Sequence, residues 1–138
     1  MNKAIIIYHS KTGITKKYGQ EIAAYLKTRD IPAELLSVQE FKNELLEKYD
    51  TVFLGCWTSG LMLFLQHPEK IWADFASKIV GLKEKQVVLF TTYKLATGSM
   101  FRKMRKHLNG KISGIKAELK SRRGILSDID KTILDDLI

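Results

Sequence analysis

Three hydroxyl side chains and a glycine lie together in one short segment, Ser10-Lys11-Thr12-Gly13-Ile14-Thr15. The segment follows the apolar run Ala4–Tyr8 and comes just before a helical pattern. Backbone N–H groups at a helix N-terminus favour anions, and a glycine lets the backbone approach a ligand closely. Because the segment has neither the Walker lysine pattern nor G-x-G-x-x-G, it predicts a site for a single phosphomonoester. The alternative is an ordinary N-cap at Ser10 or Thr12 that binds no ligand.

Other reactive side chains form no recognisable site. His9, His67 and His107 have no metal-ligand spacing relative to Cys56, so we predict no metal site. Cys56 ends an apolar run and is interpreted as a small core residue, not a redox thiol. Because no serine, histidine and aspartate triad can be read from the sequence, we predict no catalytic residues.

The positive charge is concentrated in the second half of the chain. The net charge is +8, and residues 75–125 contain thirteen Lys or Arg against two acidic residues. Such a surface attracts an acidic partner, and the attraction weakens as the salt concentration rises. Aromatic residues are not interleaved with these cations, apart from Phe101, so we predict no nucleic-acid binding. Simple solubilisation is the alternative interpretation of this charge.

Strand and helix patterns alternate along the chain. Apolar runs predict strands at Ala4–Tyr8, Ala33–Val38, Thr51–Cys56 and Gln86–Thr91, and alternation predicts a fifth strand at 115–120. Apolar residues at helical spacing predict four helices, which begin near Ile14, Pro68, Ser99 and Ser127. Pro68 suits the first turn of its helix, Ser99 can cap its helix, and Ser127 with Asp130 resembles a capping box. Residues 39–48 are weakly helical or irregular. Ile129, Ile133, Leu134 and Leu137 would form the core face of the last helix.

This order of elements predicts a parallel sheet with helices on both faces. Ligands of such sheets bind at the carboxyl ends of the strands. We therefore expect the site to be formed by three loops, at residues 10–15, 57–65 and 92–98.

The length of 138 residues is expected to form a single domain, 1–138, with no linker. One cysteine and a short N-terminal apolar run predict a reducing, cytoplasmic location without a signal peptide. Thr51–Pro68 contains no charged residue, but its polar residues and helix breakers argue against a membrane span.

The loop segments resemble those of flavodoxins. Ser10–Thr15 is similar to the flavodoxin phosphate loop, [ST]-x-T-G-x-T, while Leu54-Gly55-Cys56 and 88–93 resemble the short flavodoxins of anaerobic bacteria. The resemblance covers nearly the whole chain and implies a three-layer α/β/α sandwich whose five-stranded parallel sheet has the order 2-1-3-4-5. It also implies one non-covalently bound FMN and a role in electron transfer. The cofactor-binding residues that it implies are Ser10, Lys11, Thr12, Gly13, Ile14, Thr15, Trp57, Thr58, Ser59, Gly60, Thr92, Tyr93, Lys94 and Gly98.

The chain departs from the flavodoxin pattern around the flavin ring. Ser59 and Leu95 stand where flavodoxins usually carry large ring-stacking side chains, which leaves Trp57 and Tyr93 as the candidates for stacking. Flavodoxins are strongly acidic near the ring, whereas here the loop after the fourth strand contributes Lys94. A cation near the ring favours the reduced anion, so we expect a less negative second reduction step.

The run Leu61–Leu65 is apolar where flavodoxins are polar, and it predicts either partner docking or homodimerisation, or else core packing. The resemblance favours an FMN-binding electron carrier, and the basic second half of the chain implies that its redox partner is acidic. An FMN-dependent reductase or oxidase acting on a quinone, a tetrapyrrole or another organic substrate is the first alternative. A flavin-free binding module of the same fold is the second.

Overall fold

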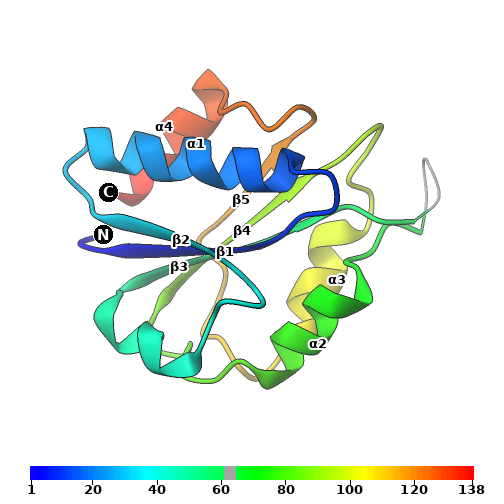
Figure 1. Cartoon of the computed structure of the whole chain (residues 1–138), viewed down its shortest axis with the longest axis horizontal. Coiled ribbons are helices and arrows are strands. Elements are labelled where there is room, and N and C mark those ends of the chain that lie inside the picture. The colour runs from blue at the N-terminus through cyan, green and yellow to red at the C-terminus, as the bar shows by residue number, and fades with distance from the viewer. Residues whose placement is uncertain (61–64) are drawn as a thin grey trace.

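The computed structural model describes residues 1–60 and 65–138, whose five strands form one parallel sheet (Figure 1). The strands are β1 (Ala4–His9), β2 (Ala33–Ser37), β3 (Thr51–Trp57), β4 (Gln86–Thr92) and β5 (Ala117–Ser121). Their order in the sheet is β2-β1-β3-β4-β5, which confirms the predicted topology. The central strands are fully buried because helices cover both faces, and this explains their uninterrupted apolar runs.

The helices divide into two layers. α1 (Ile14–Thr28) and α4 (Asp128–Leu137) cover one face of the sheet. α2 (Lys70–Lys78), α3 (Met100–His107) and the 3-10 helix η1 (Asn43–Lys48) cover the other face (Figure 1). The result is the predicted three-layer arrangement, with a hydrophobic core on each side of the sheet.

Alternate strand residues supply the two cores. Ile6, Phe53 and Phe90 point to the α1 face, where the ring of Phe90 meets that of Tyr18 edge-on at 6.0 Å. Gly55 lies directly beneath the ring of Phe90, so that any side chain at this position would collide with it. Close packing of this kind places β3, β4 and α1 in one fixed arrangement.

Predictions about two helix starts and about one core position of α4 need correction. α2 begins at Lys70, because Glu69 is still extended, so Pro68 lies outside the first turn. Ser99 occupies the predicted N-cap position of α3, but its hydroxyl donates to the carbonyl of Gln66 at 2.7 Å and makes no cap bond to the helix. Ile129 is 74% exposed and lies outside the core, whereas the capping box of Ser127 and Asp130 is present as predicted.

Both chain ends lie at the edge of the sheet where the strands begin (Figure 1). The carboxylate of Asp50 accepts the N–H groups of Asn2 and Lys3 and so attaches the N-terminus to the start of β3. Near the other end, Asp130 accepts the hydroxyl of Tyr18 at 2.8 Å, which fastens α4 to α1.

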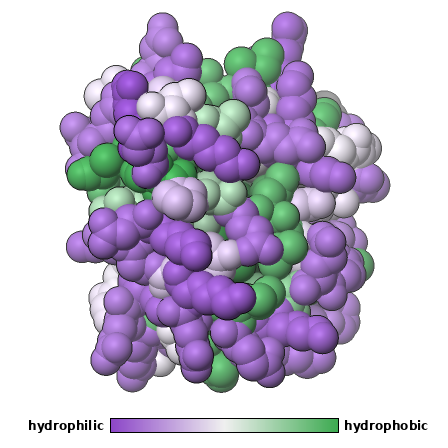
Figure 2. Space-filling model, turned by 60° about the vertical axis from the view of Figure 1, so that its left-hand side comes forward, coloured by the Kyte–Doolittle hydropathy of each residue, from purple (hydrophilic) through white to green (hydrophobic). Residues whose placement is uncertain are grey.

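Hydrophilic residues form most of the face shown in Figure 2, with apolar residues gathered in a band between them. Among the described residues, no helix has both the length and the apolar character needed to cross a membrane.

Candidate functional site

The loops after β1, β3 and β4 meet at the carboxyl edge of the sheet. The hydroxyls of Thr15 and Thr92 lie 2.6 Å apart and join the start of α1 to the end of β4. The N–H of Thr58 donates to the carbonyl of Thr92 at 2.8 Å, and the hydroxyls of Thr58 and Thr91 lie 2.8 Å apart. Hydrogen bonds between threonines thus connect the three predicted loops.

The turn between β1 and α1 is closed from inside by Ser10. Its hydroxyl accepts the N–H of Gly13 at 3.0 Å and that of Lys16 at 3.3 Å. Gly13 occupies the N-cap position with φ of 90°, so the predicted alternative of a plain cap at Ser10 or Thr12 is wrong in that form. We name residues 10–15 the phosphate turn.

The outer side of the phosphate turn is open. A side-chain carbon at Gly13 would meet no atom within 4 Å. The first helical bond runs from Lys17 to the carbonyl of Gly13 at 2.9 Å, so the N–H groups of Ile14 and Thr15 lack acceptors within the described part of the chain. Free N–H donors at the positive end of a 15-residue helix suit an anion such as a phosphate.

The other side chains of the turn have separate positions. Thr12 and Lys11 are exposed, whereas Thr15 is only 1% exposed and its hydroxyl is used by Thr92. Thr15 therefore presents its backbone N–H to the open side, while its side chain fastens the turn to β4.

Trp57 lies beside the phosphate turn. The ammonium of Lys11 is 4.8 Å from the centre of the indole ring, a cation–π distance. The indole Nε1 is buried and has no hydrogen-bond partner among residues 1–60 and 65–138. An unpaired buried donor is costly, so a ligand oxygen at this position would be stabilised by it.

The loop after β3 turns back on itself. The backbones of Ser59 and His67 exchange two hydrogen bonds of 3.0 and 2.9 Å. Gly60 has φ of 116°, and a side chain there would collide with the carbonyl of Leu65. Glycine is thus required at Gly60.

The predicted docking run falls within this loop. Leu61 to Phe64 lie outside the described residues, and Leu65 is 58% exposed.

The loop after β4 rests on a segment that the sequence did not assign to the site. Tyr93 donates its N–H to the carbonyl of Ser121 at 3.2 Å, and Arg122 donates to the carbonyl of Lys94 at 3.0 Å. Tyr93 is half-buried, while Lys94 is exposed. The run of cations from Lys120 to Arg123 was the sequence signal that could have indicated this loop after β5.

Gly98 has a different place from the other predicted residues. It lies against the side chain of buried Gln66, with φ of 49°, where any larger residue would clash. This contact links the loops after β3 and β4, and Gly98 itself is exposed, so its predicted role in cofactor binding stays a prediction.

Cys56 and His9 are buried beneath the loops. Burial raises the pKa of the Cys56 thiol to about 12. His9, at the end of β1, lies with Nε2 3.3 Å from a carboxylate oxygen of Glu69. The described residues contain no cluster of three or more potential metal ligands.

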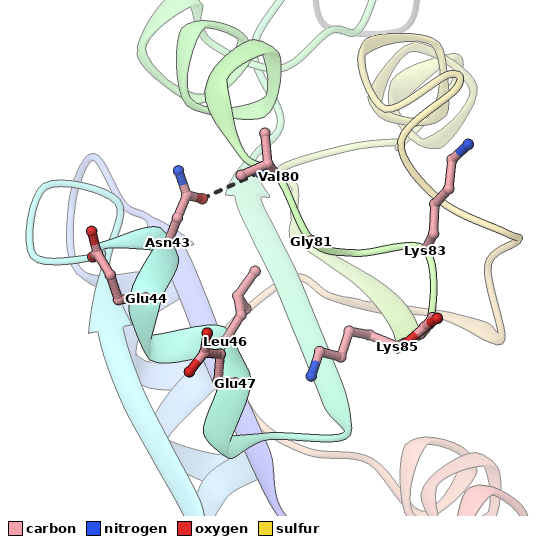
Figure 3. Close-up of a pocket in the computed structure, with 9 residues that line it drawn as sticks. Asn43, Glu44, Leu46, Glu47, Val80, Gly81, Lys83 and Lys85 are labelled. Carbon is pink, nitrogen blue, oxygen red and sulfur yellow. Dashed lines mark hydrogen bonds between the residues drawn. The ribbon is translucent and has the colours of Figure 1, made fainter.

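A hollow of about 550 Å³ lies at the opposite edge of the molecule (Figure 3). It is bounded by η1 on one side and by the segment before β4 on the other, where Asn43 accepts the N–H of Val80 at 3.2 Å. Lys83 and Lys85 flank it on the second side. This hollow lies where β3 and β4 begin and is therefore separate from the phosphate turn.

Comparison with known proteins identifies the family. The flavodoxin domain model matches residues 5–118, and the chain therefore belongs to the flavodoxin family.

Solved flavodoxins share the fold at low sequence identity. Two-electron reduced flavodoxin of Megasphaera elsdenii is 21% identical, with a TM-score of 0.76 and 94% of each chain covered. Oxidised flavodoxin 1 of Bacillus cereus is 20% identical, with a TM-score of 0.73 and coverage of 98% of this chain and 94% of that one. A variant flavodoxin of Fusobacterium nucleatum bound to flavin mononucleotide is 17% identical, with a TM-score of 0.62 and coverage of 99% and 92%.

Proposed function

We propose that residues 1–138 form one flavodoxin domain that binds FMN and transfers electrons. The open phosphate turn carries this proposal. Gly13 leaves the space above the helix end free, and the N–H groups of Ile14 and Thr15 find no acceptor in the described part of the chain. Membership of the flavodoxin family supports the identity of the phosphate ligand as FMN.

The phosphate would be held by backbone and hydroxyl donors. Ile14 and Thr15 would donate N–H groups, and the exposed hydroxyl of Thr12 would add a third donor. Ser10 would keep the turn closed through its bonds to Gly13 and Lys16, and Lys11 would supply a positive charge nearby.

The indole N–H of Trp57 would donate a hydrogen bond to the phosphate or to the ribityl chain. This donor is buried, unpaired and close to Lys11, so it would find its acceptor on the ligand. We assign Trp57 this role in place of ring stacking, and we leave stacking to the half-buried Tyr93.

When bound, FMN supplies reversible one-electron and two-electron redox chemistry. The chain would orient the ring between the backbone of Ser59-Gly60 and the side chain of Tyr93, with Thr58 and Thr92 holding the two loops together. Lys94 would lie on the solvent side, because its side chain is exposed.

The charges near the proposed ring position favour an acidic redox partner. The net charge of the chain is +8. The two loops that flank the proposed ring position, residues 57–65 and 92–98, contain Lys94 and no acidic residue. A positive surface favours productive encounters with negatively charged proteins.

The test is an absorbance and fluorescence titration of the purified protein with FMN and, in parallel, with riboflavin. We expect FMN to bind and its fluorescence to be quenched, while riboflavin binds at least about a hundredfold more weakly because it lacks the phosphate. Thr12→Val should weaken FMN binding and leave riboflavin binding unchanged, because the variant removes a phosphate donor alone.

The results would separate the candidate functions. A folded protein that binds neither flavin would contradict the proposal and leave the flavin-free module. Rapid turnover of a quinone by the loaded protein alone would assign it to the reductases instead of the electron carriers. Equal affinity for both flavins would contradict the role given to the phosphate turn.

A further inference from the structure

The loop after β5 joins the start of α1 to the loop after β4. On one side, Ser121 and Arg122 bond the backbone of Tyr93 and Lys94. On the other side, Gly124 packs so closely that a side-chain carbon there would lie 2.6 Å from the carbonyl oxygen of Ile14. Residues 121–125 therefore lie at the carboxyl edge, directly beside the phosphate turn.

This junction gathers exposed cations that lack a carboxylate partner among the described residues. Lys17, Lys94, Arg122 and Arg123 are all exposed, and none of them forms an ion pair with the residues that the structure describes. Among the described residues, three cations in other parts of the molecule do form ion pairs: Arg29 with Asp135, Lys70 with Asp74 and Arg105 with Glu118. Four unpaired charges at one edge remain available to an external anion.

Two isoleucines lie among these cations. Ile14 is 41% exposed and Ile125 is 52% exposed. Exposed aliphatic groups surrounded by charge are typical of a protein-binding surface with an apolar centre and a polar rim. Single-stranded nucleic acid would instead call for aromatic residues on which bases stack.

We infer that this surface, Ile14, Lys17, Lys94, Arg122, Arg123 and Ile125, docks an acidic electron-transfer protein. We name it the basic edge. The partner's carboxylates meet the four cations, and an apolar side chain of the partner covers Ile14 and Ile125. The redox nature of the partner rests on the proposed function, whereas the docking of an acidic surface does not.

The first test maps an acidic probe on the full chain without added flavin. The ¹⁵N-labelled protein is titrated with hexaglutamate, and amide shifts are followed by NMR. We expect shifts at residues 14–17, 94–95 and 121–125, with an affinity that falls at least about fivefold when salt is raised from low to physiological strength. Shifts centred on α3, around Arg102 and Lys106, would overturn the inference.

The second test compares two double variants of equal net charge. Lys17→Glu with Arg123→Glu changes the basic edge and leaves the bond from Arg122 to Lys94 in place. Glutamate also suits position 17, in the first turn of α1, so the fold is not weakened there. The control, Lys48→Glu with Lys83→Glu, changes the opposite edge, where Lys83 flanks the hollow of Figure 3.

We expect the basic-edge variant to weaken hexaglutamate binding about tenfold and the control variant to weaken it less than about twofold. Equal effects would show that net charge alone attracts the probe and would overturn the inference. Tighter binding of a hexathymidylate oligonucleotide than of hexaglutamate at the same edge would assign the surface to nucleic acid and overturn it as well.

The loaded protein gives a further readout. Reduced FMN-loaded protein is mixed with ferricyanide, an anion, or with hexaammineruthenium(III), a cation. The basic-edge variant should slow oxidation by ferricyanide several-fold and not oxidation by the cation. If the peptide maps to the basic edge but no flavin binds, the proposed function fails while the docking surface stands. If flavin binds but the variant leaves both oxidation rates unchanged, the docking inference fails alone.

Discussion

At the scale of single residues, Cys56 illustrates how burial decides chemistry. Its side chain is fully buried at the end of β3, and burial raises the pKa of the thiol to about 12. Thiolates are the reactive form of cysteine, so this thiol is held in its unreactive form at neutral pH. Its proximity to the phosphate turn therefore does not make it a redox group.

We predict that native protein will not react with Ellman's reagent at pH 8 over the time in which a free cysteine reacts completely. In urea the same protein should release one equivalent of chromophore, because it contains a single cysteine. Reaction of the native protein at the rate of a small thiol would contradict this assignment.

Lys94 provides a second prediction at this scale. Its exposed ammonium is expected to stabilise the negative charge that a bound flavin gains on full reduction. Lys94→Gln should make the second one-electron step more negative by about 40 mV, which corresponds to about 1 kcal/mol. Potentiometric titration measures this shift, and Lys83→Gln at the opposite edge serves as the control. A change of equal size in the control would assign the effect to overall charge.

At the scale of elements, the junction of β3, β4 and α1 depends on a missing side chain. Phe90 covers the face of Gly55, and its ring contacts Tyr18 of α1 edge-on. Gly55→Ala should lower the free energy of unfolding by about 2 kcal/mol, because the ring must move within a close-packed core. Urea denaturation measures the loss.

Gly114→Ala is the matched control for this variant. A side chain at Gly114 meets nothing within 4 Å and its backbone is not left-handed, so its stability should change by less than about 0.5 kcal/mol. If Gly55→Ala behaved like Gly114→Ala, the packing of Phe90 would not be the constraint described.

The elements could largely be predicted from the sequence, because their signals are local. Three strands, β1, β3 and β4, are almost completely buried, and β2 is half-buried. The sequence predicts the bounds of all four to within one residue. Helix starts were less predictable. The start of α2 depends on the pairing of Ser59 with His67, and the position of Ser99 on its bond to Gln66, neither of which leaves a local pattern.

The site was predictable in part for the same reason. The phosphate turn is a contiguous segment, so its glycine and hydroxyl residues can be recognised in the sequence. The bond between Thr15 and Thr92 joins residues 77 positions apart, and the support of Lys94 by Arg122 joins two separate loops. Such contacts exist only once the sheet has formed, so no spacing in the sequence reveals them.

At the scale of the whole molecule, acidity should weaken the fold through a few fastened carboxylates. Although burial opposes it, hydrogen bonds from the N–H groups of Lys3 and Asn2 hold the pKa of Asp50 below its ordinary value. The hydrogen bond from Arg29, with that from Tyr25, lowers the pKa of Asp135. A carboxyl whose folded pKa is depressed stabilises the protein above its unfolded pKa, and this contribution is lost as pH falls through the folded pKa.

We therefore expect the contribution of these two aspartates to stay constant from pH 7 to about pH 5 and to be lost progressively as the pH falls below about 4, through their lowered folded pKa values. Asp50→Asn should be less stable than the parent at pH 6, and the difference should shrink by pH 3. Chemical denaturation at several pH values measures both effects. Asp136→Asn is the control, because the exposed carboxylate of Asp136, in α4, forms no hydrogen bond or ion pair with the side chains or backbone of the described residues. A difference that persists unchanged at pH 3 would show that Asp50 acts by shape instead of charge.

Both ends of the chain emerge at the edge opposite the phosphate turn and the basic edge (Figure 1). A linker fused to either terminus would therefore anchor the molecule to a solid support with its redox face turned outward. On a gold electrode this orientation would leave the flavin edge accessible to dissolved mediators, so voltammetry of the tethered protein could follow partner association in real time.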